Sequence, residues 1–175
     1  MEDMPEMELV GYVDPDPCGL SIIEEHSNSL IQYQALDQMI NESSLDLLWV
    51  ASPNHLHLEH IRLGLEAGLK VFSEKPIVTT KEDSFALAKL IKKYGENQLI
   101  VGLVLRYSVH MKEMRRVIDA GTLGKITSLE ANEHIAPYHG SFFMRDWRRL
   151  EKYSGGFMLE KCCHDIDLYN GIVGE

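Results

Sequence analysis

Cysteine is scarce in this sequence, and its placement excludes a disulfide-stabilised scaffold. The chain of 175 residues has three cysteines, of which Cys162 and Cys163 are adjacent and Cys18 is far away. An odd number with this spacing does not form a disulfide framework and is typical of a reducing compartment. We therefore expect a cytoplasmic protein.

Basic residues and long apolar runs are also few. Lys and Arg number 17 against 27 Asp and Glu, which gives a formal net charge of −10. Because nucleic acids and anionic membranes are bound through basic patches, this balance argues against both. No apolar run approaches the roughly 18 to 20 residues of a membrane span, and the acidic residues 1–8 do not resemble a signal or transit peptide. A small molecule or a protein is the expected partner.

Apolar residues make up 45% of the chain, enough for a real core. Short β-rich runs alternate with helical patterns up to about residue 105. The predicted strands are 7–13, 45–51, 69–73 and 99–105. The last three are nearly continuous apolar runs, which are typical of strands buried on both faces. Helical spacing is seen in Leu58, Ile61, Leu65 and Gly68, and again in Leu87, Leu90, Ile91 and Tyr94 after a cap at Thr79 or Thr80. This order predicts an α/β fold with a doubly wound parallel sheet.

The pattern changes after residue 105. A helix with Met111, Met114 and Ile118 on one face is expected to end at Gly121. Residues 125–133 alternate like a strand exposed on one side, residues 136–156 are expected to be irregular, and a last helix is expected at 160–173. We therefore predict two domains, 1–105 and 106–175.

Two strand ends in the first half carry polar groups. Asp14 follows the run 7–13, where an acid can bind a ribose 2′-hydroxyl, although Asp-Pro is also ordinary turn chemistry. Ser52-Pro53-Asn54 follows the run 45–51 and precedes a helix, whose first N–H groups are free for a phosphate or amide.

Histidines follow that loop. His55 and His57 form a His-x-His pair that also occurs in metal-dependent hydrolases, and His57 shares a helix face with His60. No further His/Asp set at strand ends accompanies the pair, so exposed histidines at a helix start are the simpler interpretation. No metal site is predicted.

Two more motifs contain acid–base groups. Glu74-Lys75-Pro76 follows the run 69–73, and burial there is expected to let the Lys75 amine act as an acid or a base. Glu160, His164 and Asp167 lie on one stripe of the last predicted helix, where a carboxylate can orient an imidazole for proton exchange near neutral pH. A salt-bridged helix face is the alternative.

In this order and spacing the segments resemble the Gfo/Idh/MocA oxidoreductases, which pair a Rossmann domain with an α/β substrate domain. The matching stretches are LVGYVDPDP, SPNHLHLEHIRLGLEAGLKVFSEKP, Arg106-Tyr107, DWRR and SGGFMLEKCCHDIDL. The resemblance implies reversible oxidation of a secondary alcohol of a sugar or polyol, with a nicotinamide cofactor, in a protein that can form a homo-oligomer.

The resemblance also implies roles for particular residues. Asp14 would bind the adenosine ribose, which favours NAD over NADP. His164 would be the base, with Lys75 and Glu160 orienting it, although Lys75 is an alternative base. The dinucleotide would be lined by Ser52, Pro53, Asn54, His57, Glu74, Lys75, Arg106, Trp147 and Arg148.

The sequence departs from the family pattern in two ways. Glu160 stands where Asp is usual, and Lys161 and Cys162 replace a small apolar residue and a glycine. No G-x-G-x-x-G phosphate loop occurs among the 13 glycines, and the first expected strand, loop and helix of the Rossmann domain have no counterpart. We therefore expect a piece of a longer enzyme with weak turnover by itself. A catalytically inactive binding or oligomerisation module is the alternative, and a metal-dependent hydrolase is a lesser one.

Overall fold

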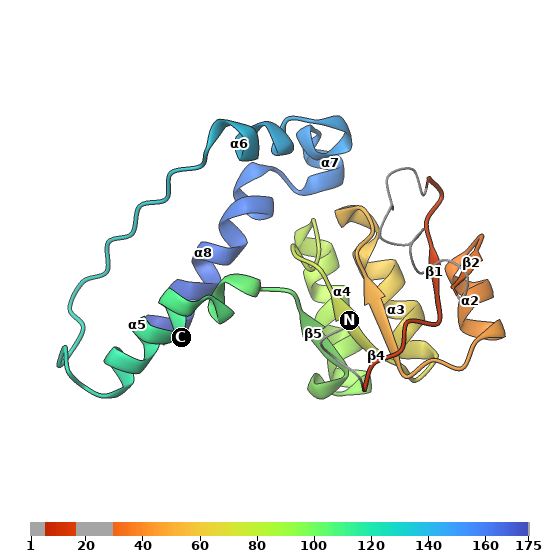
Figure 1. Ribbon diagram of the computed structural model, residues 1–175, viewed down its shortest axis with the longest axis horizontal. Coiled ribbons are helices and arrows are strands. Elements are labelled where there is room, and N and C mark those ends of the chain that lie inside the picture. The colour runs from red at the N-terminus through yellow and green to blue at the C-terminus, as the bar shows by residue number, and fades with distance from the viewer. Residues whose placement is uncertain (1–5, 17–29, 175) are drawn as a thin grey trace.

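The computed structural model describes residues 6–16 and 30–174 and contains two parallel sheets (Figure 1). The smaller sheet pairs β1 (Gly11–Val13) with β2 (Ile31–Tyr33). The larger sheet has the order β3 (Leu47–Val50), β4 (Lys70–Ser73) and β5 (Leu99–Val101). The expected α/β class with parallel strands is confirmed, the strands are shorter than predicted, and β2 was not predicted. Cys18 lies outside the described residues, and Cys162 and Cys163 are free thiols.

Helices cover one face of the larger sheet (Figure 1). α3 (His57–Glu66) contacts β3 and β4, and α4 (Lys81–Tyr94) lies beside α3. Ile61 on α3 and Val71 on β4 are fully buried at this contact. α2 (Leu36–Glu42) packs on the smaller sheet and also contacts α3, so one core joins the two sheets.

The opposite face of the larger sheet is only partly covered in the described part of the chain. Trp49, Phe72 and Ile100 lie side by side in register on the three strands, and the Trp49 and Phe72 ring centroids are 4.4 Å apart. Trp49 and Ile100 are 53% and 50% exposed. The prediction that these strands are buried on both faces is therefore wrong for this face, because apolar runs do not show which face a helix will cover.

α4 shows how local sequence fixes an element. The Thr80 hydroxyl accepts a hydrogen bond from the Asp83 amide at 3.1 Å, and Glu82 and Asp83 complement the helix dipole in the first turn. Gly95 ends the helix with a φ of 103°, a value that favours glycine. Of the two threonines that the sequence offered as caps, Thr80 is the one used.

Gly64 lets α3 approach the sheet closely. A Cβ atom at this position would lie 2.8 Å from Val71 Cγ2 and 2.9 Å from Leu48 Cδ2, closer than carbon atoms pack. We expect Gly64→Ala to lower the free energy of unfolding by about 1–3 kcal/mol, the usual cost of overpacking. Urea unfolding followed by circular dichroism measures this change. Gly68→Ala is no matched control because its φ is 79°, so Ala67→Gly on the exposed helix end serves instead.

The second half of the chain is built mainly of helices (Figure 1). α5 (Val109–Asp119) and α8 (Phe157–Val173) lie side by side, and Arg115 on α5 donates to the Gly171 carbonyl on α8. Residues 136–156, which were expected to be irregular, contain short helices. α8 starts at Phe157, three residues before the predicted position. The elements are η3 (Val104–Tyr107), α5 (Val109–Asp119), α6 (Pro137–Phe143), η4 (Asp146–Arg149), α7 (Glu151–Ser154) and α8 (Phe157–Val173).

Residues 125–133 were predicted to form a strand, and this prediction is wrong for the described structure. The segment is extended but has no strand partner among the described residues, and it passes along the outer edge of the molecule (Figure 1). An alternating pattern marks a chain suited to a sheet, but a strand also needs a neighbour to accept its hydrogen bonds. One contact anchors the segment to α8, an ion pair between Glu133 and the buried Lys161.

Candidate functional site

Three parallel strands end side by side and bring polar loops to one edge of the larger sheet. The Glu74 amide donates to the Val50 carbonyl at 2.8 Å, and the Gly102 amide donates to the Ser73 carbonyl at 2.8 Å. Ligands of parallel α/β sheets bind beyond the carboxyl ends of the strands. The loops 51–54 and 74–76 therefore lie where such a ligand would be expected.

A cavity of about 270 Å³ opens at this edge. Its walls come from both halves of the chain, because η4 and α8 lie across from the strand ends. The lining residues are Ala51, Ser52, Pro53, Asn54, His57, Glu74, Lys75, Phe142, Trp147, Arg148 and Glu160. The structure thus brings together most of the residues that the sequence indicated separately, and it adds Phe142, which no motif suggested.

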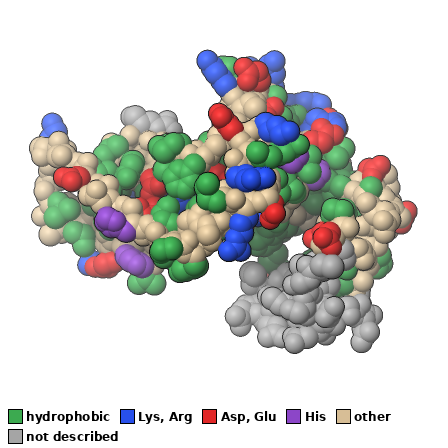
Figure 2. All heavy atoms as spheres, turned by 90° about the horizontal axis from the view of Figure 1, so that it is seen from above, with side chains coloured by type: hydrophobic (Ala, Val, Ile, Leu, Met, Phe, Trp, Pro, Cys, Tyr) green, Lys and Arg blue, Asp and Glu red, His purple; other side chains and the backbone are tan. Residues whose placement is uncertain are grey.

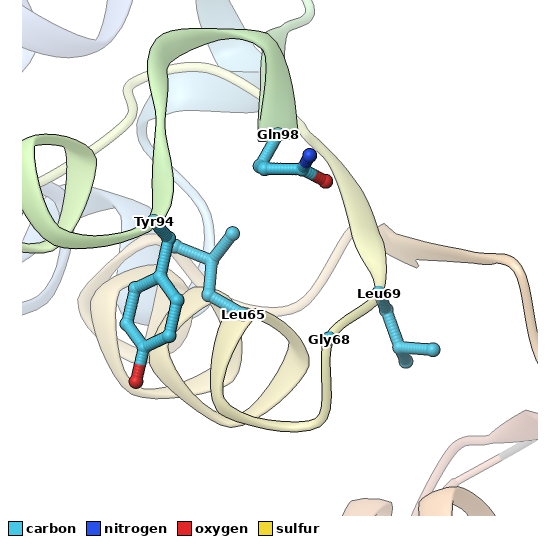
Figure 3. Close-up of a pocket in the computed structure, with 5 residues that line it drawn as sticks. All are labelled: Leu65, Gly68, Leu69, Tyr94 and Gln98. Carbon is cyan, nitrogen blue, oxygen red and sulfur yellow. The ribbon is translucent and has the colours of Figure 1, made fainter.

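A second hollow of about 200 Å³ lies at the opposite ends of the strands (Figure 3). It is lined by Leu65, Gly68, Leu69, Tyr94 and Gln98, and its residues precede β4 and β5 rather than follow them. The Tyr94 hydroxyl is its one titratable group, and Lys93 Nζ contacts that oxygen at 2.7 Å. This hollow offers no arrangement for acid–base chemistry.

Lys75 reaches across the cavity to α8. Its Nζ donates a hydrogen bond of 3.0 Å to the main-chain carbonyl of Glu160. Because Lys75 bonds to the main-chain carbonyl of Glu160, the side-chain carboxyl of Glu160 stays free for other partners. A lysine ammonium has three donors, so further N–H groups remain for a ligand oxygen.

Glu160 is nearly inaccessible, with 3% of its surface exposed. Burial raises the pKa of its carboxyl, and Lys75, Arg148 and a hydrogen bond from the Asn54 side chain oppose that rise. Arg148 Nε lies 3.8 Å from Glu160 Oε1, whereas Oε2 has no hydrogen-bond partner among the described residues. A buried carboxyl oxygen without a partner is costly and is typical of a site that receives a ligand.

His164 lies one helical turn after Glu160 on α8. Its Nδ1 is buried and, like Glu160 Oε2, has no partner in the described ranges 6–16 and 30–174. Burial lowers the pKa of His164, and the nearby Lys75 and Lys161 lower it further. The imidazole is therefore neutral near pH 7 and has a nitrogen lone pair available to accept a proton.

Arg148 is held in place by aromatic rings. Its guanidinium carbon lies 4.1 Å from the Phe142 ring centroid and 4.5 Å from that of Trp147. Stacking of this kind fixes the guanidinium plane while its edge stays available for hydrogen bonds. Trp147 and Arg148 are therefore placed at the cavity by η4, as the motif in the sequence suggested.

His57 links the two loops of the cavity wall. Its Nδ1 lies 2.8 Å from the Pro76 carbonyl oxygen, and its Nε2 lies 2.8 Å from the Ser52 carbonyl oxygen. The side chain is 1% exposed. Because both ring nitrogens contact main-chain oxygens, His57 holds the loops that contain Ser52 and Pro76 next to each other.

The same contacts argue against the metal-dependent hydrolase. His55 packs on the Tyr153 ring with centroids 4.7 Å apart, and both nitrogens of His57 are engaged. His60 Nδ1 contacts the Ser52 hydroxyl at 2.8 Å. No group of three His, Cys, Asp or Glu side chains in the described structure is placed to hold a metal ion.

Three predicted site residues lie outside the cavity lining. Asp14 directly follows β1 in the smaller sheet, where its Oδ1 accepts from the Asp16 amide at 2.9 Å, the turn contact that the sequence offered as an alternative. Arg106 on η3 forms an ion pair with Asp167 on α8. His164 is the third, and it lies four residues after Glu160 on the same helix.

Charged side chains of both signs are interspersed on the surface (Figure 2). The face shown has Lys and Arg among Asp and Glu, without the single-signed basic stripe that nucleic-acid binding needs. None of the helices in the described ranges has both the length and the apolar character needed to cross a lipid bilayer.

Comparison with known proteins assigns the family. The model of the oxidoreductase family with an NAD-binding Rossmann fold matches residues 1–103, and the GFO/IDH/MocA C-terminal domain matches residues 111–175. The chain therefore belongs to the Gfo/Idh/MocA oxidoreductase family, as the motifs predicted. Since the family binds NAD, the predicted nicotinamide cofactor is confirmed for the family.

Relatives of known sequence or structure cover nearly all of this chain. YteT of Bacillus subtilis (strain 168), a protein named as an oxidoreductase, is 30% identical over 96% of the chain and 40% of its own length. The 2,7-anhydro-N-acetylneuraminate hydratase of Escherichia coli (strain K12) is 26% identical over 83% of the chain and 38% of its own length.

A solved structure supports the same fold. The scyllo-inositol dehydrogenase of Lactobacillus casei, with bound NAD(H) and scyllo-inositol, has a TM-score of 0.77 at 25% identity. The match covers 95% of this chain and 48% of that protein. The chain thus spans about half the length, or less, of the relatives that it matches.

Proposed function

We propose that the protein transfers a hydride between a secondary alcohol of a sugar or polyol and NAD. The observation that carries the proposal is the cavity at the strand ends, where Lys75 from the first half meets Glu160 from the second. Glu160 Oε2 at this cavity and His164 Nδ1, one helical turn farther along α8, are buried and have no partner in the described structure. Hydroxyl groups of a sugar or polyol are suitable partners for both atoms.

The cavity walls fit the nicotinamide end of a dinucleotide. The polar loops at the strand ends and the stacked Trp147–Arg148 pair supply both hydrogen-bonding and aromatic surface. We assign cofactor contacts to Ser52, Pro53, Asn54, His57, Glu74, Lys75, Arg106, Trp147 and Arg148, and the adenosine ribose to Asp14. NAD, when bound, supplies the hydride acceptor for alcohol oxidation.

In the proposed mechanism the chain's own residues handle the proton. As the alcohol carbon loses hydride, its hydroxyl must lose a proton, and His164 Nδ1 accepts it because the imidazole is neutral there. The ammonium of Lys75 stabilises the developing alkoxide, and Glu160 orients the substrate hydroxyl. We further propose domains 1–105 and 106–175. Homo-oligomer formation stays a prediction.

Titration of NADH into the protein, followed by nicotinamide fluorescence, tests the cofactor assignment. Subsequent addition of NAD and a panel of inositols, hexoses and pentoses, with absorbance of NADH as the readout, tests the reaction. Net formation of NADH identifies a dehydrogenase. NADH binding without net reduction by any alcohol would instead favour an inactive module or a reaction without net redox change, and no binding would overturn the proposal.

The role of Asp14 in choosing the cofactor is testable separately. Asp14→Asn removes the charge but keeps a side-chain oxygen for the Asp16 amide. Since a carboxylate repels a 2′-phosphate, we expect the ratio of NADPH to NADH affinity to rise by about tenfold or more, the effect of about 1.4 kcal/mol. Asp37→Asn on the exposed start of α2 is the control and should leave the ratio unchanged.

A further inference from the structure

Two of the hydrogen bonds that join the strand-end loops to the second half of the described structure end near the start of α8. One is the bond from Lys75 Nζ to the Glu160 carbonyl. The other runs from Asn54 Nδ2 to the Ser154 carbonyl at 3.3 Å, between residues 100 positions apart. Asn54 is 6% exposed and Ser154 is fully buried. A buried side-chain hydrogen bond between residues so far apart in the sequence tethers two parts of the fold to each other.

The turn that receives this bond is tightly built. The Ser154 hydroxyl donates to the Leu150 carbonyl at 3.2 Å and accepts from the Gly156 amide at 3.1 Å. Gly155 has a φ of 78°, and a Cβ there would lie 2.5 Å from Leu159 Cδ2 and 3.0 Å from the Thr79 carbonyl oxygen. The turn 154–156 therefore rests directly on the loop before α4, and α8 starts from a fixed point.

The position of the turn 154–156 determines where α8 places Glu160 in the candidate active site. Glu160 lies in the first turns of the helix, and its amide donates to the Gly156 carbonyl at 2.9 Å. A helix is stiff over such a short distance, so a shift of the turn 154–156 moves the Glu160 carboxyl against Lys75. Misplacement of a catalytic group by about 1 Å can reduce a rate by about 10²-fold.

We propose that the Asn54 side chain is a positioning residue that ties the loop after β3 to the start of α8 and so aligns Glu160 with Lys75. This inference rests on the proposed function for its consequence, but the tether itself is independent of any ligand. It gives the Asn54 side chain a role in addition to cofactor contact, because the side chain holds the two halves of the chain in register.

Asn54→Ala tests the tether without cofactor. We expect the Glu160 carboxyl, observed by NMR in protein labelled with ¹³C-glutamate, to titrate at higher pH, because it loses both the hydrogen bond from Asn54 and its alignment with Lys75, and each of these lowers its pKa in the intact protein. Arg148 is the other group that lowers the pKa of this carboxyl. Amide hydrogen exchange in the turn 154–156 should accelerate about tenfold, as expected for a lost hydrogen bond. Glu160→Gln assigns the resonance.

The alternative role predicts a different pattern. If Asn54 serves the cofactor alone, Asn54→Ala will weaken NADH binding about tenfold, and the exchange of the turn 154–156 will stay as it was. That result would overturn the proposal. Absence of NADH binding by the unaltered protein would count against the proposed function only, because neither the titration nor the exchange experiment uses cofactor.

Two further variants make the test independent of folding defects. Asn54→Asp has nearly the same shape but cannot donate to the Ser154 carbonyl, so it should show the same faster exchange in the turn 154–156. Unchanged exchange in Asn54→Asp would contradict the tether. Asn97→Ala, at an exposed asparagine in η2 (Glu96–Gln98), is the matched control and should change neither readout.

Discussion

Replacement of His164 by Gln is expected to lower kcat for alcohol oxidation by about 10²- to 10⁴-fold, the usual contribution of a general base. Gln keeps polar atoms in the space of the imidazole but cannot accept the substrate proton. The affinity for NADH should stay nearly unchanged, because His164 does not line the cavity. Stopped-flow measurement of hydride transfer separates this effect from product release.

The pH dependence of the same step provides a second check. A base works only when it is deprotonated, and burial and Lys75 lower the pKa of His164 below the ordinary value of 6.5. The rate should therefore hold through pH 6.5 and fall only in more acidic solution. This acidic limb should vanish in His164→Gln and persist in His110→Gln, a control at an exposed position of α5. An unchanged limb in His164→Gln would assign the proton to Lys75 or another group.

Glu160→Gln is expected to reduce activity and increase stability at the same time. The carboxyl orients substrate, so kcat should fall about tenfold or more, the size of one lost hydrogen bond in a transition state. Stability should rise near pH 8 by about 1 kcal/mol, since an unpartnered buried carboxylate oxygen is costly. A gain of stability at the expense of activity is a recurrent property of catalytic positions.

The sign of this stability effect depends on pH. The folded protein raises the pKa of Glu160 above the ordinary value of 4.5, so ionisation favours the unfolded chain. The stability associated with the neutral carboxyl is fully present below pH 4.5 and is lost as the pH rises through the raised pKa. The difference between Glu160→Gln and the unaltered protein should therefore be small at pH 4 and grow toward pH 8. Urea unfolding at several pH values measures it, and a constant difference would show that ionisation of Glu160 is not the cause.

Local sequence signals predicted the elements that present the site. Thr80 marks the start of α4, and the apolar runs before Ser52 and Glu74 mark β3 and β4 with their polar ends. These features depend on neighbours a few residues away, through caps and strand periodicity. Sequence reasoning could therefore place Lys75 at a strand end and Glu160 with His164 on one helix stripe.

The larger errors concern interactions with distant parts of the fold. Residues 125–133 have the alternation of a strand but no partner in the described structure, and the apolar strand β3 has Trp49 half exposed on one face. The ion pair between Arg106 and Asp167 on α8 was likewise not predicted, and the predicted cofactor contact of Arg106 stays a prediction. Each outcome depends on which segments become neighbours, and the local pattern is the same whether or not they do.

The sequence by itself determined the parallel α/β class, the family and the chemical groups available at the strand ends. It did so because strand periodicity, caps and motif spacing are local properties of the chain. Tertiary structure alone decided that Asn54 bonds to Ser154, that Phe142 and Trp147 enclose Arg148, and that Glu160 Oε2 and His164 Nδ1 stay buried without partners. These features require segments up to 100 residues apart to meet, and burial and pKa shifts arise only from that meeting.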